Sequence, residues 1–350
     1  MALKVGLVGA GGIARPHLVA FVRNAHVDEV HVADTSAEAR ERLCGEFGII
    51  KQAVARYEEL LADDTIDLID ICTPHHLHHP IAMAAFKAGK HVITEKPIAM
   101  TLKQADEMIA AAKRAKRRLF IALCQRMFPA HIEAKKIIDA GEIGKPFLGI
   151  ANIIGNEFDR MNDPNSWKGD WKKAGGGALI DTGYHAVYML QHFLGPARAV
   201  TAMTKRLRVE PKHKADDTSV VALEMSEGVI ANIVVTYCAT GDRWSESRQI
   251  IGPKGSLLIR DNPEDEVPLI GVVEGEVIPV KVHNPLSINP YAIMQTINHF
   301  IECILANKAP DITNAEARAA LATVLAAYRS EREGRRVQVS EVESAGGGAA

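Results

Sequence analysis

Apolar and polar positions alternate in two different rhythms along the chain. Over about the first 120 residues, short runs rich in Val, Ile and Leu are separated by stretches whose apolar positions recur with the period of a helix. Each crossover helix must bury its apolar stripe against a sheet, so this rhythm predicts a doubly wound parallel α/β domain with both sheet faces covered. The expected strands are Lys4–Val8, Glu29–Ala33, Asp67–Cys72, His91–Thr94 and Leu119–Leu123, and the expected helices are Ile13–Asn24, Ser36–Phe47, Tyr57–Ala62, Pro80–Ala88 and Leu102–Lys116.

The rhythm changes after residue 123. A helix near Pro129–Ala140 and a Gly-rich break at Gly141–Lys145 are followed by runs with a period of two and no helices between them. This pattern predicts a largely antiparallel sheet, so we expect domains over residues 1–123 and 124–340 and a disordered small-residue tail over 341–350. The expected elements are strands at Phe147–Ile154, Ala199–Arg206, Ser219–Glu224, Val229–Tyr237, Gln249–Ile251 and Leu257–Ile259, and helices at Tyr291–Ala306 and Ala315–Glu333.

Charge and composition narrow the partners that the chain can have. The 41 basic and 43 acidic residues among 350 are well mixed, which argues against nucleic acid or an acidic membrane as a partner. The longest apolar runs, such as Asp67–Thr73 and Val229–Tyr237, are shorter than the roughly 18 residues of a spanning helix, and no leader-like segment opens the chain. Five scattered cysteines without zinc-like spacing predict reduced thiols. We expect a cytoplasmic protein that binds small molecules or another copy of itself.

A glycine-rich turn follows the first expected strand. Residues 9–14 read GAGGIA and lead at once into a helix, which fits the G-x-G-x-x-G/A dinucleotide pattern in its strand–turn–helix context. Gly9 allows the tight turn, Gly11 lets the backbone approach a pyrophosphate, and Ala14 permits close packing of the helix on the strand. The residues expected to contact the cofactor here are Gly9, Gly11, Gly12, Ile13 and Ala14.

An aspartate stands at the end of the second expected strand. Asp34 lies twenty positions beyond Ala14, where a carboxylate binds both hydroxyls of the adenosine ribose and repels a 2′-phosphate. The sequence therefore favours NAD as cofactor. NADP stays open, because Ser36 and Arg40 follow closely and could help to hold a phosphate, although Arg40 is equally explained as an exposed helix residue. Thr35 and Arg40 are further candidates for cofactor contacts.

Four histidines occur within five positions directly after the strand Asp67–Cys72. The segment from residue 73 to 80 reads TPHHLHHP, at an edge where doubly wound sheets bind ligands. Imidazoles crowded on one turn cannot all converge on one ion, and no acidic or cysteine ligands lie nearby, so we expect no metal. Most of these histidines should be surface side chains at a helix N-terminus. We expect Thr73, Pro74 and His78 to line the cofactor cleft.

Lys96 follows the next strand at the same edge of the sheet. The segment Thr94–Pro97 reads TEKP, and an ammonium group at this position can stabilise the alkoxide that develops from a substrate alcohol. A proline after the lysine raises the possibility of a cis peptide bond. A Lys-Pro pair taken alone is also typical of an ordinary loop.

The third candidate stretch, residues 175–185, reads GGGALIDTGYH. Three glycines permit the backbone to approach a ligand, and Asp181 and His185 are four positions apart, so a helix would place both on one side. An aspartate beside an imidazole raises its basicity and orients its ring, as a general base requires. A buried histidine paired with a capping aspartate is the alternative explanation of the same spacing.

Together these motifs resemble the Gfo/Idh/MocA oxidoreductases, a family named for glucose–fructose oxidoreductase, inositol dehydrogenase and rhizopine catabolism. The motifs, spread over roughly residues 3–335, are GAGGIA, CTPHHLHHPIA, EKP, CQRMFPAH and GGGALIDTGYH. The resemblance implies an N-terminal Rossmann domain, a C-terminal domain on a largely antiparallel open sheet, and an active site between them. It also implies association through the outer face of that sheet, as a homodimer or homotetramer.

The resemblance assigns roles to individual residues. Lys96 matches the lysine that contacts the substrate and polarises its hydroxyl, His185 matches the histidine that shuttles the proton, and Asp181 matches its acidic partner. Family members frequently carry an aspartate three residues after the histidine, where this chain has Tyr188. The implied reaction is hydride transfer between nicotinamide and a secondary alcohol or ketone. Glu95 and His78 match cofactor-side positions, and Arg126 matches a position that faces the substrate or the nicotinamide.

The substrate implied by the resemblance is a sugar, a sugar derivative or a cyclitol. The polar and aromatic loop Asn162–Trp171 suits stacking on such a ring, with Trp167 as the expected contact, although aromatic residues here are equally explained by packing. Two alternatives stay open. One is an enzyme of the same fold that uses bound NAD transiently for glycosidic bond cleavage or elimination, and the other is a non-catalytic regulator that binds a ligand.

Overall fold

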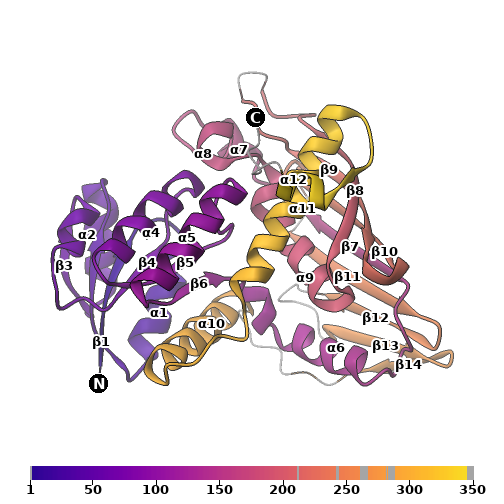
Figure 1. Cartoon of the computed structure of the whole chain (residues 1–350), viewed down its shortest axis with the longest axis horizontal. Coiled ribbons are helices and arrows are strands. Elements are labelled where there is room, and N and C mark those ends of the chain that lie inside the picture. Colours follow the sequence, from indigo (N-terminus) through magenta and orange to yellow (C-terminus); the bar gives the residue numbers. More distant parts are fainter. Residues whose placement is uncertain are drawn as a thin grey trace. The chain divides into compact units, whose positions relative to one another are not determined.

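The computed structural model divides the chain into two compact units. It describes residues 2–210, 213–241, 244–260, 267–280, 282 and 288–344. The first unit comprises Met1–Ala99, Lys103–Cys124 and Asn289–Ala317, and the second comprises Met100–Leu102, Gln125–Ile288 and Arg318–Ala350. Figure 1 labels most helices and strands of both units.

One segment belongs to a different unit from the one predicted. The sequence assigned residues 124–340 to the second domain, but Asn289–Ala317 lies with the first unit. The Phe300 ring stacks on Phe120 with 4.7 Å between ring centroids, and the side chains of Asn24 and Asn298 are hydrogen-bonded at 2.7 Å. Helical period alone does not reveal which sheet a helix covers, so the sequence could not show this.

Six parallel strands form the sheet of the first unit, which confirms the predicted doubly wound fold. The strands are β1 (Leu3–Val8), β2 (Val27–Ala33), β3 (Ile50–Val54), β4 (Leu68–Ile71), β5 (His91–Glu95) and β6 (Leu119–Ala122). Their order is β3-β2-β1-β4-β5-β6, and every pair is parallel. The order reverses between β1 and β4, where such sheets bind ligands beyond the carboxyl ends of the strands. The sequence missed β3 because only Val54 of this strand is fully buried.

Helices of the first unit follow the predicted apolar stripes within a few residues. They are α1 (Ala14–Arg23), α2 (Ala37–Glu46), α3 (Tyr57–Leu61), α4 (His78–Lys87), α5 (Leu102–Ala115) and α10 (Ile288–Leu305), with a 3₁₀ turn at His75–Leu77. Among the described residues, no helix combines the length and apolar character that crossing a membrane requires.

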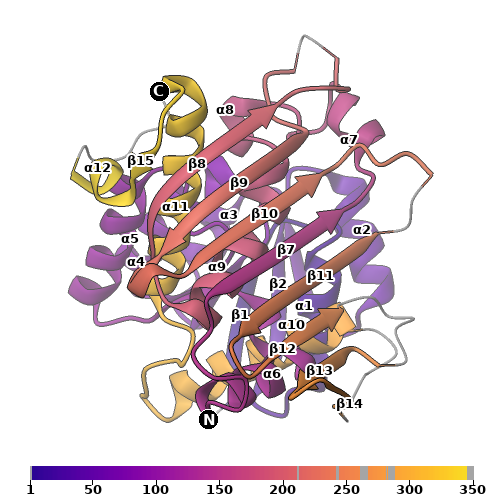
Figure 2. The ribbon, with the colours of Figure 1, turned by 90° about the vertical axis from the view of Figure 1, so that its right-hand side faces the viewer.

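The second unit is built on a nine-stranded sheet, shown face-on in Figure 2. Its strands are β7 (Leu148–Ile154), β8 (Ala197–Lys205), β9 (Thr218–Met225), β10 (Ile230–Thr236), β11 (Ser245–Gly252), β12 (Gly255–Arg260), β13 (Leu269–Val273), β14 (Glu276–Pro279) and β15 (Val337–Gln338). The order is β14-β13-β12-β11-β7-β10-β9-β8-β15, and β7 with β10 is the one parallel pair among these strands, which confirms the largely antiparallel sheet.

Helices of the second unit pack against this sheet. They are α6 (Pro129–Asp139), α7 (Phe158–Asn162), α8 (Trp171–Ala174), α9 (Tyr184–Leu194), α11 (Asn314–Glu333) and α12 (Val339–Ser344), with 3₁₀ turns at Cys124–Met127 and Ser226–Gly228 and a π-helical turn at Leu179–Gly183. A Cβ at Gly149 of β7 would lie 2.5 Å from Leu194, so the missing side chain lets α9 pack directly on the strand. The sequence did not predict β13, β14, β15 or α12.

The predicted disordered tail over residues 341–350 is wrong for residues 341–344. These residues complete α12, whose Val339 and Val342 are buried and which packs beside β8. Residues 345–350 lie outside the described part of the chain.

The sequence suggested that the three glycines at 175–177 leave room for a ligand. In the structure they pack against other parts of the protein instead. A Cβ at Gly177 would lie 1.8 Å from the Asp216 carbonyl oxygen, and one at Gly176 would lie 2.2 Å from the Tyr328 hydroxyl. The buried Asp216 carboxylate accepts hydrogen bonds from the Gly177 and Leu179 N–H groups at 2.7 and 3.0 Å. Tyr328 donates to the same carboxylate at 2.7 Å. Burial raises the pKa of Asp216.

We expect Gly177→Ala to lower the free energy of unfolding by at least about 2 kcal/mol, because its methyl group would overlap a backbone oxygen that cannot move away. The measurement is denaturant unfolding followed by circular dichroism. Gly271→Ala in β13 is the control, since a Cβ there would meet the Ile278 carbonyl oxygen at an ordinary 3.6 Å. Equal stability of the two variants would contradict this packing.

Candidate functional site

The turn at residues 9–14 has the geometry that a pyrophosphate requires. Gly9 has φ +100° and a Cβ on it would lie 2.5 Å from the Cys72 carbonyl oxygen, so no other residue fits there without strain. A Cβ built on Gly11 or Gly12 would meet no protein atom within 4 Å. Helix α1 then begins at Ala14, and no side chain caps its N-terminus. Open space and uncapped N–H groups at a helix start together fit a bound phosphate.

Asp34 is bonded to this same turn. Its Oδ2 accepts a hydrogen bond from the Ala10 N–H at 2.7 Å, and its Oδ1 accepts one from the Ser36 N–H at 2.8 Å. Thr35 is exposed, and the Arg40 guanidinium donates to the Asp34 carbonyl oxygen. The carboxylate therefore lies at the carboxyl end of β2, beside the glycine turn, and Arg40 is directed at the backbone of the same loop.

The loop after β4 supplies an unsatisfied hydroxyl. Thr73 Oγ1 is buried and has no hydrogen-bond partner among the described residues, and its methyl group lies 3.2 Å from a Cβ built on Gly9. Buried hydroxyl groups are nearly always paired, so an unpaired one beside the glycine turn fits a cofactor that completes the site. Pro74 directly precedes the 3₁₀ turn that starts at His75.

His78 joins two loops of the first unit. Its Nδ1 lies 2.8 Å from the Pro97 carbonyl oxygen and its Nε2 lies 3.0 Å from the Thr73 carbonyl oxygen. Burial lowers the pKa of His78. The prediction that most of the four histidines are surface side chains is wrong for His75, which is buried on the 3₁₀ turn, and His78, which was expected to line the cofactor cleft, is buried at the start of α4.

Lys96 follows β5 in a loop fixed by its neighbours. Its side chain is half-buried, and the Lys96–Pro97 peptide bond is cis, as the sequence suggested. The Glu95 carboxylate accepts the Lys96 N–H through Oε2 at 3.2 Å and contacts His17 Nε2 through Oε1 at 3.1 Å. Glu95 therefore holds the backbone that carries the lysine.

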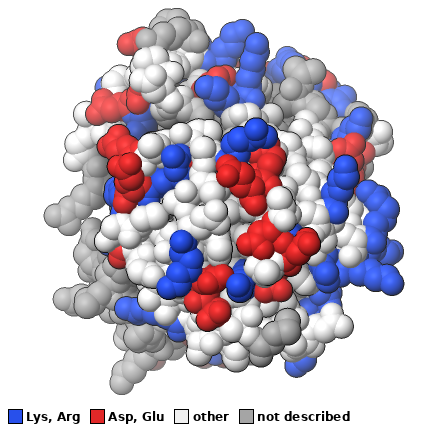
Figure 3. Space-filling model, turned by 90° about the vertical axis from the view of Figure 1, so that its left-hand side faces the viewer, with Lys and Arg blue, Asp and Glu red and all other residues white. Residues whose placement is uncertain are grey.

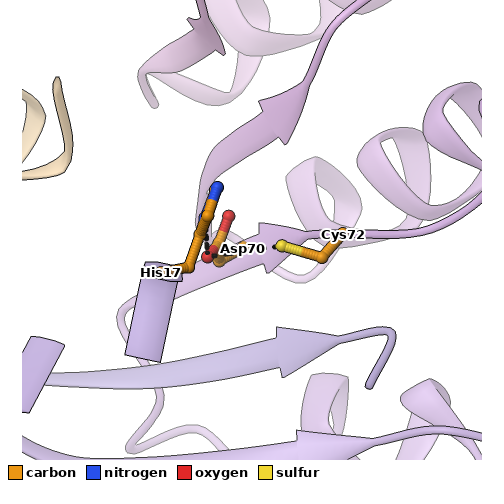
Figure 4. A group of neighbouring side chains, drawn as sticks. All are labelled: His17, Asp70 and Cys72. Atoms are coloured by element: carbon orange, nitrogen blue, oxygen red, sulfur yellow. Dashed lines mark hydrogen bonds and ion pairs between the residues drawn. The ribbon is translucent and has the colours of Figure 1, made fainter. Parts of the chain in front are cut away.

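His17, Asp70 and Cys72, shown in Figure 4, form a buried cluster that contacts Glu95 through His17. Their donor atoms lie within 4.8 Å of one another, but His17 Nδ1 is hydrogen-bonded to Asp70 Oδ2 at 2.7 Å while Nε2 faces Glu95. Both ring nitrogens thus meet carboxylate oxygens, which leaves neither lone pair for an ion. Burial raises the pKa of the Cys72 thiol to about 12, so it stays protonated. The cluster is a buried imidazolium between two carboxylates rather than a metal site.

In the second unit, the His185 side chain is partly exposed within a buried stretch of chain. Every residue from 174 to 190 is buried except His185, which is half-buried. Its Nδ1 lies 2.8 Å from the Tyr188 hydroxyl. The role of Asp181 as the acidic partner of this imidazole stays a prediction.

Asp181 is bonded to two groups that the sequence did not connect with it. Its Oδ2 accepts hydrogen bonds from Lys168 Nζ at 2.6 Å and from the Tyr237 hydroxyl at 2.8 Å. The Lys168 ammonium also lies 5.8 Å from the centre of the Trp167 ring and 5.3 Å from that of Tyr237. Lys168 lies in the loop marked as a substrate loop, but nothing in its spacing relates it to Asp181.

The second unit also contains Arg126, a further sequence candidate, and Trp171, the last residue of the loop Asn162–Trp171. Arg126 is half-buried on the 3₁₀ turn Cys124–Met127, and burial, together with the charge of Arg126, lowers the pKa of His192 to about 3. Trp171 packs against Tyr328, with ring centroids 5.0 Å apart, so its ring serves the core.

Comparisons with known proteins agree with this architecture. Residues 3–123 match the family described as "Oxidoreductase family, NAD-binding Rossmann fold", and residues 131–258 match the "GFO/IDH/MocA C-terminal domain". The chain is 30% identical to a 1,5-anhydro-D-fructose reductase of Ensifer adhaerens over 97% of this chain and 98% of that protein. It is 26% identical to an NAD(+)-dependent scyllo-inositol 2-dehydrogenase of Bacillus subtilis over 96% of each chain. A levoglucosan dehydrogenase solved with NADH and levoglucosan has a TM-score of 0.88 at 24% identity, covering 97% of this chain and all of that one (100%).

We expect His17→Gln to lower the free energy of unfolding by about 3–5 kcal/mol, because it leaves two buried carboxylates without their cation. Burial alone lowers the pKa of His17, but the charge of Asp70 raises it, and the net pKa lies well above the usual value. The stabilisation is therefore complete below about pH 6.5, the unfolded-state pKa, and is lost as the pH rises through the folded-state pKa.

The measurement is thermal unfolding of both proteins at pH 6 and pH 9. The difference in midpoint between wild type and His17→Gln should be larger at pH 6. The exposed His26, replaced by Gln, is the control and should change little. A difference that does not depend on pH would rule out a charged His17.

Proposed function

This chain belongs to the Gfo/Idh/MocA oxidoreductases, and from that premise we propose that it transfers a hydride between NAD and a secondary alcohol or ketone of a sugar, a sugar derivative or a cyclitol. The predicted family, the oxidoreductase class and the NAD cofactor are confirmed by the family match and by the relatives. The observation that carries the proposal is the presence, in one chain, of the open glycine turn, the Lys96 ammonium after β5 and the half-buried His185 imidazole.

Names of the relatives support the substrate class. They include a 1,5-anhydro-D-fructose reductase, a levoglucosan dehydrogenase and two inositol dehydrogenases. Each name denotes a cyclic polyol or an anhydro-sugar. A ring that carries several hydroxyl groups suits a loop in which Trp167 and Lys168 lie side by side, and we propose Arg126 and Trp167 as further substrate contacts.

Cofactor binding is assigned to the first unit. The N–H groups at Gly11, Gly12 and Ile13 would hold the pyrophosphate at the start of α1, and the Asp34 carboxylate would accept the ribose hydroxyls. Thr73 Oγ1 would gain the partner that it lacks within the chain. Ala14, Thr35, Arg40, Pro74, His78 and Glu95 complete the proposed cofactor side.

The chain's own residues then move a proton and stabilise a charge. His185 takes the proton of the substrate hydroxyl as a general base, and the Lys96 ammonium stabilises the negative charge that develops on the same oxygen. Bound NAD supplies the hydride acceptor, or the donor in the reverse direction. Lys168 forms an ion pair with Asp181, so the Asp181 carboxylate is already paired with a cation when the substrate binds.

We propose that the partner of this chain is a second copy, bound through the outer face of the nine-stranded sheet. That face exposes Met203, Val220 and Ile230 by 60%, 39% and 58% and contains a hollow of about 330 Å³. Figure 3 shows a different face, on which acidic and basic side chains are interspersed.

We also propose a cytoplasmic location, because all five cysteines are free thiols.

Lys96→Ala should lower the turnover by about 10²–10⁴-fold, since the ammonium acts on charge that develops in the transition state. NADH should still bind with an affinity within about threefold of wild type, because the phosphate turn is intact. The assay follows NADH formation with a panel of sugars, sugar acids and inositols, and binding is followed by fluorescence.

Lys103→Ala, at an exposed position of α5, is the matched control and should keep full activity. A Lys96→Ala enzyme with wild-type activity would show that Lys96 does not stabilise the charge on the substrate oxygen. Consumption of substrate without any net NADH would instead indicate transient use of the cofactor.

Asp34→Asn should weaken NAD binding by about 10–100-fold, because hydrogen bonds from the ribose to a charged acceptor contribute about 1.5–3 kcal/mol. Discrimination against NADP should fall, since the charge that repels the 2′-phosphate is lost. Titration with both cofactors measures this. Asp28→Asn, at an exposed position of β2, is the control. Wild-type activity with NADP alone would refute the role of Asp34.

A further inference from the structure

We propose that Tyr188 is a positioning residue that holds the His185 imidazole with its proton on Nδ1, so that the Nε2 lone pair is directed to the substrate. The inference rests on the proposed role of His185 as the general base. It concerns the position where the sequence departs from the family pattern, since a tyrosine stands where an aspartate is frequent.

The two side chains lie one turn apart on α9. The Tyr188 hydroxyl is 2.8 Å from His185 Nδ1, and the two rings meet at 65° with 5.5 Å between their centroids. Tyr188 is 2% exposed, whereas His185 is half-buried. One ring nitrogen of the imidazole is thus engaged by a buried group, while the residue as a whole is partly exposed.

A backbone donor orients the Tyr188 oxygen. The Gln125 N–H donates to it at 3.1 Å. A phenolic oxygen has two lone pairs, so with one of them occupied by Gln125 the other can accept the Nδ1 proton of His185. The same acceptor serves the neutral imidazole and the imidazolium, because Nδ1 carries a proton in both.

Gln125 is itself fixed by a buried network. Its Nε2 donates to Glu246 Oε2 at 2.8 Å, its Oε1 accepts from the Arg248 guanidinium, and its carbonyl oxygen lies 2.7 Å from His131 Nδ1. Arg248 and Glu246 form an ion pair at 3.2 Å on β11, and the arginine is 1% exposed. The orientation of the imidazole is therefore set from the sheet, through Gln125 and Tyr188.

A neutral partner differs from a carboxylate in one respect that matters for catalysis. A carboxylate on Nδ1 stabilises the imidazolium and raises the pH above which the base is free, whereas a hydroxyl orients the ring with less effect on its charge. Tyr188 thus separates orientation of the base from control of its protonation.

Tyr188→Phe removes the hydroxyl and keeps the ring. We expect kcat for alcohol oxidation to fall by about 10–100-fold with KM within about twofold, because the base loses its orientation while the binding groups stay in place. Tyr188→Asp should restore turnover at high pH and move the acidic limb of the kcat/KM profile upward by about one unit or more. If Tyr188 had only a structural role, Tyr188→Asp would not shift the acidic limb of the kcat/KM profile, and Tyr188→Phe would not lower kcat while leaving KM unchanged.

A double substitution separates this role from packing. In a His185→Ala background, Tyr188→Phe should cause no further loss of turnover, since there is no imidazole left to orient. Tyr57→Phe, in α3, is a control for the chemistry of the substitution. A full additional loss in the double variant would overturn the proposal.

NMR of 15N-histidine-labelled protein tests the contact without relying on activity. Wild type with NADH bound should show His185 with its proton on Nδ1, and Tyr188→Phe should show a mixture of the two tautomers. A wild-type proton on Nε2 would overturn the inference. If wild type oxidises no substrate, or if His185→Ala remains fully active, the proposed function fails, and the NMR result still stands or falls by itself.

Discussion

The imidazole of His17 ties together the three elements that carry the cofactor side of the molecule. It lies in α1, directly after the glycine turn, and its two nitrogens meet Asp70 in β4 and Glu95 at the end of β5. The strands lead into the Thr73 loop and the Lys96 loop. Because a buried cation between two carboxylates is costly to break, the loops above it are held in one arrangement.

Glu95 links this network to Lys96, the proposed catalytic lysine. One of its oxygens faces His17, and the other accepts the N–H of Lys96. His78 adds a second tie between the Thr73 and Lys96 loops. The lysine therefore stands on a backbone with several fixed contacts, as a preorganised site requires.

In the second unit, buried polar groups hold the Asp181 carboxylate and the His185 imidazole in place. Asp216 holds the backbone at Gly177 and Leu179, at the start of the turn that carries Asp181. Lys168 and Tyr237 hold the Asp181 side chain, and Tyr188 contacts His185. The glycines serve this packing, since side chains on them would overlap Asp216 and Tyr328.

The sequence by itself determined the fold class and the dinucleotide turn, because periodicity and a glycine at a position of positive φ are local properties. The family, and Lys96, Asp181 and His185 as candidates, came from the resemblance of short motifs along the chain. Edge strands such as β3 were not predicted, because most of their positions are exposed and do not carry apolar residues in a strand pattern. Only the tertiary structure decided which atoms the polar side chains meet. Lys168 bonds Asp181 across 13 positions and Gln125 bonds Glu246 across 121, and no local pattern encodes a partner that folding brings from so far along the chain.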